Sequence, residues 1–160
     1  MTKHALFPGS FDPVHNGHLE VLHGALDVFD EVTVAAFDSA KSNPMFSLTE
    51  RVEMLKEATE DLANVNVTSF DGLVADFARS IDAVALVRGL RVVSDFESEL
   101  QMSQMNRHLT GIGTVLIPTA SDSSFLASRL IREVARYGGN VSDLVPAAVA
   151  RHLNKKVGSR

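Results

Sequence analysis

The stretch His4-Ala-Leu-Phe-Pro-Gly-Ser-Phe-Asp-Pro-Val-His-Asn-Gly-His18 leads from a short apolar run through a glycine-containing loop into a segment of helical period. The run His4–Phe7 is mostly apolar on both faces, as expected for a strand buried in a parallel sheet. Gly9 and Gly17 permit close approach of the backbone to a ligand. The helix that begins near His18 is expected to present free N–H groups that attract anions. The stretch therefore predicts a strand, loop and helix suited to a phosphate.

The same alternation of short apolar runs with longer stretches of helical period continues along the chain. Strands are predicted at His4–Phe7, Glu31–Phe37, Val65–Phe70, Ala83–Val87 and Thr114–Ile117. Helices are predicted at His18–Phe29, Leu48–Leu62, Leu73–Ser80, Asp95–Leu109, Phe125–Tyr137 and Pro146–Lys155. Strands that alternate with helices indicate an α/β fold, here a five-stranded parallel sheet flanked by helices.

The composition is that of an ordinary globular chain: 160 residues, a formal net charge of -5 and no cysteine. This length predicts one domain over residues 1–160, with a frayed tail over about 156–160. The lack of cysteine excludes disulfides, thiolate metal sites and cysteine nucleophiles, and it fits a reducing compartment. The apolar runs are too short to span a membrane, and the acidic balance gives no general attraction to nucleic acid. We therefore expect a cytoplasmic chain with neither of these partners.

Two histidines, His15 and His18, stand three residues apart at the predicted start of the first helix. Such a pair is typical of polar cap residues, and Asp12 before them is expected to brace the turn. A metal site is the other interpretation, but no carboxylate or third histidine follows at a spacing that would complete it. No metal ligands are therefore predicted.

Polar residues also follow the second, fourth and fifth predicted strands, at the edge where an open parallel sheet has its crevice. Arg88 and Arg91 stand around a predicted glycine turn, and the planar guanidinium donates paired hydrogen bonds to phosphate. Ion pairs are the alternative for these arginines, with Asp95, Glu97 or Glu99. The hydroxyl-rich residues 121–129 can hold a polyphosphate or cap a helix, and Lys41 can neutralise a phosphate or remain solvated.

The motif His15-Asn-Gly-His18, placed after Gly9-Ser-Phe-Asp-Pro13, resembles the signature of nucleotidyltransferases with a Rossmann-like α/β fold. The resemblance to bacterial phosphopantetheine adenylyltransferases runs almost end to end. It rests on the blocks Pro44-Met-Phe46, Glu50-Arg51, Asp76-Phe-Ala-Arg79, Arg88-Gly-Leu-Arg91, Asp95-Phe-Glu97, Glu99-Leu-Gln-Met102, Met105-Asn-Arg-His108, Ser124-Phe125 and Glu133-Val-Ala135.

This resemblance implies adenylyl transfer from ATP, with Mg²⁺, to 4′-phosphopantetheine, and a homohexamer as the assembly. It implies that His18 is the catalytic residue, which stabilises charge on the α-phosphoryl group. The ATP contacts that it implies are Ser10, Phe11, His18, Gly89, Leu90, Arg91, Glu99, Ser123, Ser124, Phe125, Leu126, Ala127, Ser128 and Arg129. The contacts to the second substrate that it implies are Ser10, Lys41, Ser42, Val74 and Arg88.

The chain departs from the family pattern in several places. The family has tyrosine where this chain has Ser98, and its lysine of the second loop falls opposite Ser42 rather than Lys41. An aromatic residue and two serines of the family are replaced by Ser123, Ala127 and Arg129. Two other functions stay open on this basis: a related nucleotidyltransferase with a different phosphorylated acceptor, and a nucleotide- or coenzyme A-binding regulatory domain without catalysis.

Overall fold

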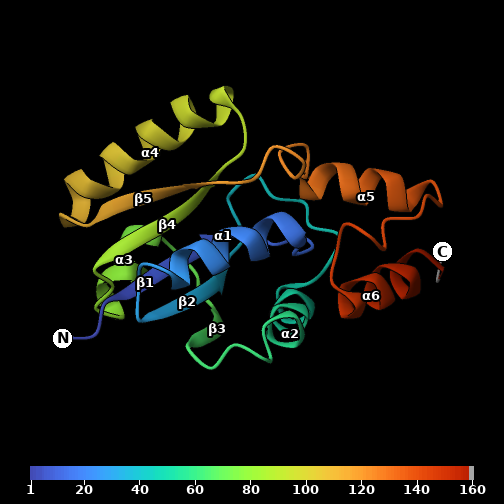
Figure 1. Cartoon of the computed structure of the whole chain (residues 1–160), viewed down its shortest axis with the longest axis horizontal. Helices are drawn as coiled ribbons and strands as arrows, with labels where there is room; N and C mark the ends of the chain where they lie inside the picture. The colour runs from blue at the N-terminus through green and yellow to red at the C-terminus, as the bar shows by residue number, and fades with distance from the viewer. Residues whose placement is uncertain (159–160) are drawn as a thin grey trace.

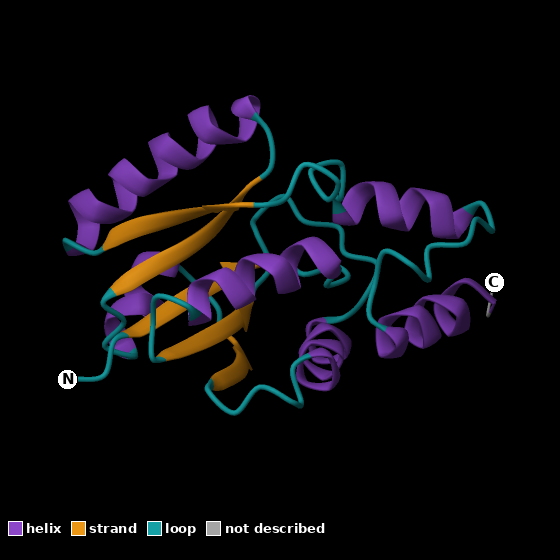
Figure 2. Ribbon diagram, in the orientation of Figure 1, coloured by secondary structure: helices purple, strands orange, loops and turns teal. Residues whose placement is uncertain are grey.

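The computed structural model describes residues 1–158 and contains one parallel sheet of five strands. The strands are β1 (His4–Gly9), β2 (Glu31–Ala36), β3 (Val65–Ser69), β4 (Ala85–Leu90) and β5 (Gly113–Pro118). Their order across the sheet is β3-β2-β1-β4-β5, so β1 lies between β2 and β4. Figure 2 shows the sheet in orange with helices on both sides. The predicted α/β fold with a five-stranded parallel sheet is confirmed.

The described chain has six helices. They are α1 (Asn16–Leu26), α2 (Leu48–Ala58), α3 (Val74–Ser80), α4 (Val93–Thr110), α5 (Ser128–Arg136) and α6 (Ala147–Gly158). Helices α1 and α2 pack on one face of the sheet, and α3 covers the other face with α4 beside it. Figure 1 shows α5 and α6 beyond the end of the sheet, on the right of the view. Within residues 1–158, no helix has the length and apolar character that a membrane crossing requires.

Alternate residues of each strand point to opposite faces of the sheet, and in the inner strands β1 and β2 both faces are buried. In β1, Ala5 and Phe7 pack into the apolar cluster on the α1 face, whereas Leu6 packs into the cluster on the α3 face. In β2, Val34 and Ala35 divide between the two clusters in the same way. Burial on both faces explains why these strands appear in the sequence as continuous apolar runs.

Two strands extend further at their carboxyl ends than the sequence predicts. β1 continues to Gly9, and β4 continues to Leu90. The residues Arg88–Leu90 pair with residues 116–118 of β5, which keeps their backbone extended. The predicted glycine turn around Gly89 is therefore wrong, because a neighbouring strand supplies hydrogen-bond partners that the local sequence does not reveal. The chain turns only after Leu90.

Helix α5 begins at Ser128, three residues later than predicted. The residues before it form turns, in which the N–H of Leu126 donates to the carbonyl of Ser123 at 3.1 Å. The Leu126 carbonyl accepts a hydrogen bond from Arg91 Nη1 at 2.9 Å. Arg91 thus anchors the turn before α5, a tertiary contact that the local sequence does not reveal.

Residues 156–158 of the predicted frayed tail are helical, because α6 continues to Gly158. Lys156 Nζ donates to the carboxylate of Glu50 on α2 at 2.9 and 3.0 Å. It also lies 5.2 Å from the centre of the Phe46 ring. These contacts fix the last helical turn against α2. Residues 159 and 160 of the predicted tail lie outside the described part of the chain.

Candidate active site

A cavity of about 290 Å³ opens where β1 and β4 end, with Gly9 from one strand and Gly89 from the other in its wall. β1 leads into α1 on one face of the sheet, and β4 leads into α4 on the opposite face. The two connections diverge at this point, which makes it the switch point where open α/β sheets bind ligands.

The structure brings many of the predicted site residues together around this cavity. The predicted residues in its wall are Ser10, Phe11, His18, Arg88, Gly89, Arg91, Glu99, Leu126, Ala127 and Ser128. Residues that the sequence did not assign to the site also line it: Phe7, Pro8, Gly9, His15, Gly17, Val21, Asp95 and Thr119. Of these additional residues, Val21 and Thr119 lay outside the stretches and motifs that drew attention in the sequence.

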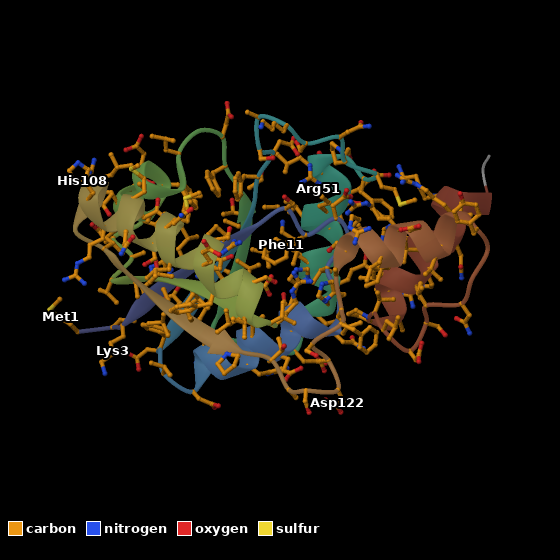
Figure 3. The ribbon with its side chains drawn as sticks, turned by 90° about the horizontal axis from the view of Figure 1, so that it is seen from above. Met1, Lys3, Phe11, Arg51, His108 and Asp122 are labelled. Carbon is orange, nitrogen blue, oxygen red and sulfur yellow. The ribbon has the colours of Figure 1, made fainter. Side chains whose placement is uncertain are left out.

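Five predicted nucleotide contacts do not line the cavity formed by residues 1–158. They are Leu90, Ser123, Ser124, Phe125 and Arg129. Arg129 lies 3.7 Å from the Glu133 carboxylate on the exposed side of α5, and Ser124 Oγ donates to the carbonyl of Ser121 at 2.9 Å. Figure 3 shows Asp122 of this loop at the edge of the molecule, away from Phe11 near its centre. Their contacts with ATP remain predictions.

A second, more apolar cavity of about 460 Å³ lies beside the first. Pro8, Arg88 and Glu99 line both cavities, and Val74 lines only the second. Its wall also contains Phe37, Leu73, Met102, Met105 and Leu109. Its mainly apolar wall, with Arg88 shared with the first cavity, suits the less polar part of a ligand that carries a phosphate.

The loop after β2 passes close to the second cavity, but Lys41 and Ser42 do not line it. Ser39 does line it, and its carbonyl accepts a hydrogen bond from the Ser42 N–H at 3.0 Å. Lys41 is therefore exposed on a turn that begins at the cavity wall. The contacts of Lys41 and Ser42 with the second substrate remain predictions.

His15 and His18 form the predicted cap at the start of α1. The Gly17 N–H donates to His15 Nδ1 at 3.0 Å, and the His15 N–H donates to His18 Nδ1 at 3.1 Å. The two rings stack with centroids 3.7 Å apart. A Cβ atom at Gly17 would lie 2.9 Å from the His15 ring, so only glycine fits there. Because Nδ1 of His18 is an acceptor, the neutral ring carries its proton on Nε2.

The first N–H groups of α1 are not free, contrary to the expectation from the sequence. The Asn16 N–H donates to the Leu144 carbonyl at 3.0 Å, and Asn16 Nδ2 donates to the Asp143 carbonyl at 3.1 Å. The N–H groups of Gly17 and His18 donate to the Nδ1 atom and the carbonyl of His15. The residues around 143 and 144 and the His15 cap thus use the amides that an anion would need.

Helix α5 presents its amino-terminal N–H groups instead. Its N-cap, Ala127, has no side chain that can bond them, and Ala127 and Ser128 line the first cavity. Among the described residues, no acceptor bonds the backbone N–H groups of residues 128–130. An anion in the cavity can therefore accept these hydrogen bonds and interact favourably with the helix dipole.

The electrostatics keep both histidines neutral. Burial, and secondly the positive charge of Arg91, lower the pKa of His15 from 6.5 to about 4. Burial also lowers the pKa of His18 well below its usual range, with further contributions from His15, Arg88 and Arg91. At neutral pH His18 therefore acts as a neutral hydrogen-bond donor through Nε2 rather than as a cation.

The lowered pKa of His15 predicts an acid-sensitive fold. The unfolded chain takes up a proton near pH 6.5 and the folded chain only near pH 4, so stability falls as the pH decreases between these values. The shift corresponds to about 3 kcal/mol in the free energy of unfolding. His15→Asn keeps a cap acceptor but does not titrate. Between pH 6.5 and 4 its free energy of unfolding, measured with urea, should therefore fall by about 3 kcal/mol less than that of the parent protein. Equal pH dependence in the two proteins would contradict this.

Arg88 and Arg91 both form ion pairs, which were the alternative considered from the sequence. Arg88 Nη2 lies 3.0 Å from Glu99 Oε1, and Arg91 Nε lies 3.1 Å from Asp95 Oδ2. Arg88 Nη1 also donates to the carbonyl of Pro8 at 2.6 Å. Each terminal guanidinium nitrogen carries a second N–H. The ion pairs therefore hold the guanidinium groups in place and still leave N–H groups that can bind a phosphate at the cavity.

Comparisons with known proteins agree with this geometry. The cytidylyltransferase-like family matches residues 6–134. A protein of Nocardioides sp. named phosphopantetheine adenylyltransferase is 48% identical over 157 residues, which cover 98% of each chain. A protein of Thermodesulfovibrio yellowstonii with the same name is 48% identical over 158 residues, again 98% of each chain. With this identity over nearly its whole length, the chain belongs to the phosphopantetheine adenylyltransferases, a family of cytidylyltransferase-like nucleotidyltransferases.

Proposed function

We propose that this protein transfers the adenylyl group of ATP to 4′-phosphopantetheine, which yields dephospho-coenzyme A and pyrophosphate. The observation that carries the proposal is the place of Arg88, which lines both cavities. An acceptor phosphate bound at Arg88 has the apolar cavity on one side for its pantetheine arm. It has the nucleotide cavity on the other side, where the α-phosphoryl group of ATP would lie.

In this reaction an oxygen of the acceptor phosphate attacks the α-phosphorus of ATP. The bond from that phosphorus to the oxygen that bridges to the β-phosphate breaks, and pyrophosphate leaves with its electron pair. The acceptor phosphate is already an anion at neutral pH, so the step needs neither a covalent enzyme intermediate nor a strong general base. Positioning of the two substrates and stabilisation of charge then account for the rate.

The side chains around the nucleotide cavity have distinct parts in this step. His18 Nε2–H would donate to an oxygen of the α-phosphoryl group as charge develops there. Arg91 and the open N–H groups at the start of α5 would bind the departing pyrophosphate. Arg88 would bind the acceptor phosphate, and its ion pair with Glu99 supports this by holding the guanidinium at the junction of the cavities.

Mg²⁺ enters the proposal as part of the nucleotide substrate. Among residues 1–158, no group of three or more His, Asp or Glu side chains is placed to hold a metal ion. The oxygen atoms of the triphosphate are themselves suitable ligands for this hard cation. We propose that ATP arrives with Mg²⁺ on its phosphates, where the ion would neutralise part of their charge.

Lys41 gives a prediction about the loop after β2. If Lys41 has the part that the family gives to its loop lysine, Lys41→Ala should raise the KM for phosphopantetheine about tenfold. The KM should rise because the variant loses one charged contact to the acceptor phosphate. The KM for ATP should stay the same because ATP binds elsewhere. Steady-state kinetics with each substrate varied in turn measure it.

The control for that prediction is Ser42→Lys, made alone and together with Lys41→Ala. A lysine at position 42 should restore acceptor binding only partly, because Lys41 and Ser42 lie at different places on the turn. An unchanged KM in Lys41→Ala would contradict the assignment, and full rescue by Ser42→Lys would transfer it to position 42.

The function itself is tested by pyrophosphate release from ATP with a panel of acceptors. The panel is 4′-phosphopantetheine, pantetheine without its phosphate, nicotinate mononucleotide and a sugar phosphate. We expect release with phosphopantetheine alone. Faster pyrophosphate release with another phosphorylated acceptor would indicate a related nucleotidyltransferase. Binding of ATP without pyrophosphate release in the presence of any acceptor would indicate the regulatory domain.

Two further properties belong to the same proposal. We propose a homohexamer, supported by exposed apolar side chains of α4 that line neither cavity, namely Val93, Phe96 and Leu100. Apolar side chains in such number on one helix favour a subunit contact. We also propose the cytoplasm as the compartment, which a chain without cysteine fits.

A further inference from the structure

The loop between β1 and α1 contains a residue in an unfavourable backbone conformation. Phe11 has a φ of +49°, in the left-handed region that side chains other than glycine rarely adopt. Its ring is buried and packs edge-on against His18, with centroids 4.9 Å apart, and against Phe7 at 5.3 Å. The conformation of Phe11 therefore sets a contact with the proposed catalytic histidine, and contacts around the loop must maintain it.

The carbonyl groups on both sides of Phe11 accept hydrogen bonds from arginines. The Ser10 carbonyl accepts from Arg51 Nη1 at 3.0 Å, and the Asp12 carbonyl accepts from Arg132 Nη1 at 2.7 Å. Arg51 belongs to α2 and Arg132 to α5, so the two hydrogen bonds reach the loop from different helices. Figure 3 shows Phe11 and Arg51 near each other beside α2.

Each arginine is itself held in place. Arg51 is only 1% exposed, and its Nε donates to the carbonyl of Phe46 at 3.1 Å while Nη2 bonds the carboxylate of Asp38. Arg132 Nη1 also lies 3.6 Å from the Asp12 carboxylate. That carboxylate accepts the N–H groups of residues 45 and 46 at 2.8 and 2.9 Å, so Asp12 braces the turn as the sequence predicted.

We propose that Arg51 and Arg132 are positioning residues that fix Phe11 and thereby the ring of His18. Neither arginine lines the nucleotide cavity or touches the reacting atoms. They act through the Ser10–Phe11 peptide group and the Asp12–Pro13 peptide group, which bracket Phe11 and Asp12 and which the two helices hold in place. This inference rests on the proposed function in one respect: the orientation of the His18 ring affects the rate because His18 is the catalytic residue of the proposed reaction.

Arg132 offers the cleaner test because its side chain is partly exposed, unlike that of Arg51. Arg132→Met removes the donor, Arg132→Lys keeps a cation that can donate to the Asp12 carbonyl, and Arg136→Met is a matched control on the exposed side of α5. We expect Arg132→Met to lower kcat at least about tenfold, since a small misplacement of a catalytic group has effects of this size. KM for both substrates should stay within about threefold, Arg132→Lys should recover most of kcat, and Arg136→Met should match the parent protein.

A second measurement separates positioning from stability and needs no substrate. The NMR shift of His18 Cε1–H depends on the ring current of Phe11, and Phe11→Leu gives its value without that ring. In Arg132→Met this shift should move towards the Phe11→Leu value, whereas a role in stability alone would lower Tm and leave the shift unchanged. If Arg132→Met does not fold, the same shift in Arg51→Lys decides.

A parental kcat together with an unchanged His18 shift in Arg132→Met would overturn the proposal, and so would an effect confined to KM. Failure of the proposed function would look different. In that case the parent protein would release no pyrophosphate with phosphopantetheine, while the shift of His18 would still report whether the arginines fix Phe11.

Discussion

Replacing His18 by alanine is expected to lower kcat about 100- to 1000-fold, the usual effect of removing one donor that acts in the transition state. The Kd for ATP should change little, because the hydrogen bond from Nε2 forms chiefly as charge develops on the α-phosphoryl group. Single-turnover rates and ATP binding, measured on the same preparation, separate the two effects.

The cap at the start of α1 makes a control necessary, since His18 Nδ1 also accepts the His15 N–H. His18→Gln keeps an acceptor at this helix position, as in a capping box, but removes the imidazole. It should retain the stability of the parent protein and lose as much activity as His18→Ala. Turnover at the parental rate in either variant would remove His18 from the mechanism, and recovery of activity in His18→Gln would make it a cap residue only.

Arg88→Lys is the second change with a large expected effect. We expect kcat/KM for phosphopantetheine to fall about 100-fold, since lysine keeps the charge but does not reproduce the fixed, paired donors of the guanidinium. The guanidinium is oriented by Glu99 and by the carbonyl of Pro8, and a flexible ammonium would satisfy these partners and the phosphate less well. ATP binding should be less affected.

Arg91→Lys is the matched comparison, because Arg91 is also paired with a carboxylate and lines only the nucleotide cavity. Its larger defect should be in the use of ATP. Pantetheine without its phosphate should be a poor acceptor for the parent protein. If both variants impair ATP alone, or if pantetheine reacts as well as phosphopantetheine, the assignment of Arg88 is wrong. If Arg88→Lys and Arg91→Lys both have the kinetics of the parent protein, the two arginines serve only to form their ion pairs.

The fold could be predicted from the sequence because its strands are buried on both faces and its helices separate them. The predicted ends were wrong where tertiary contacts decide them. Arg88–Leu90 are extended because β5 lies beside them, and α5 begins after a turn that Arg91 anchors at the Leu126 carbonyl. Neither partner is near in sequence, so no local pattern indicates the contact.

The site could be predicted in part, on the same physical grounds. From its spacing alone, Arg88 could either contact a phosphate or form an ion pair. The structure shows that Arg88 forms the ion pair and also lines the cavity. Arg51 stood in the block Glu50-Arg51 but was given no role, and Arg132 gave no signal, because an arginine on a helix usually lies at the surface. Only the three-dimensional structure shows that the guanidinium of Arg51 is buried against the carbonyl of Ser10.

The contact between Asn16 and the segment around Leu144 has a consequence for the synthesis of this protein. The turn before α1 is synthesised before most of the sheet, yet one of its hydrogen-bond partners lies 128 residues later. Ser128 Oγ, which donates to the Pro13 carbonyl at 2.9 Å, also emerges late. A nascent chain that ends before α5 has all five strands but lacks these partners. The histidine turn therefore has all its partners only after Leu144 has been synthesised, later than the sheet that carries it.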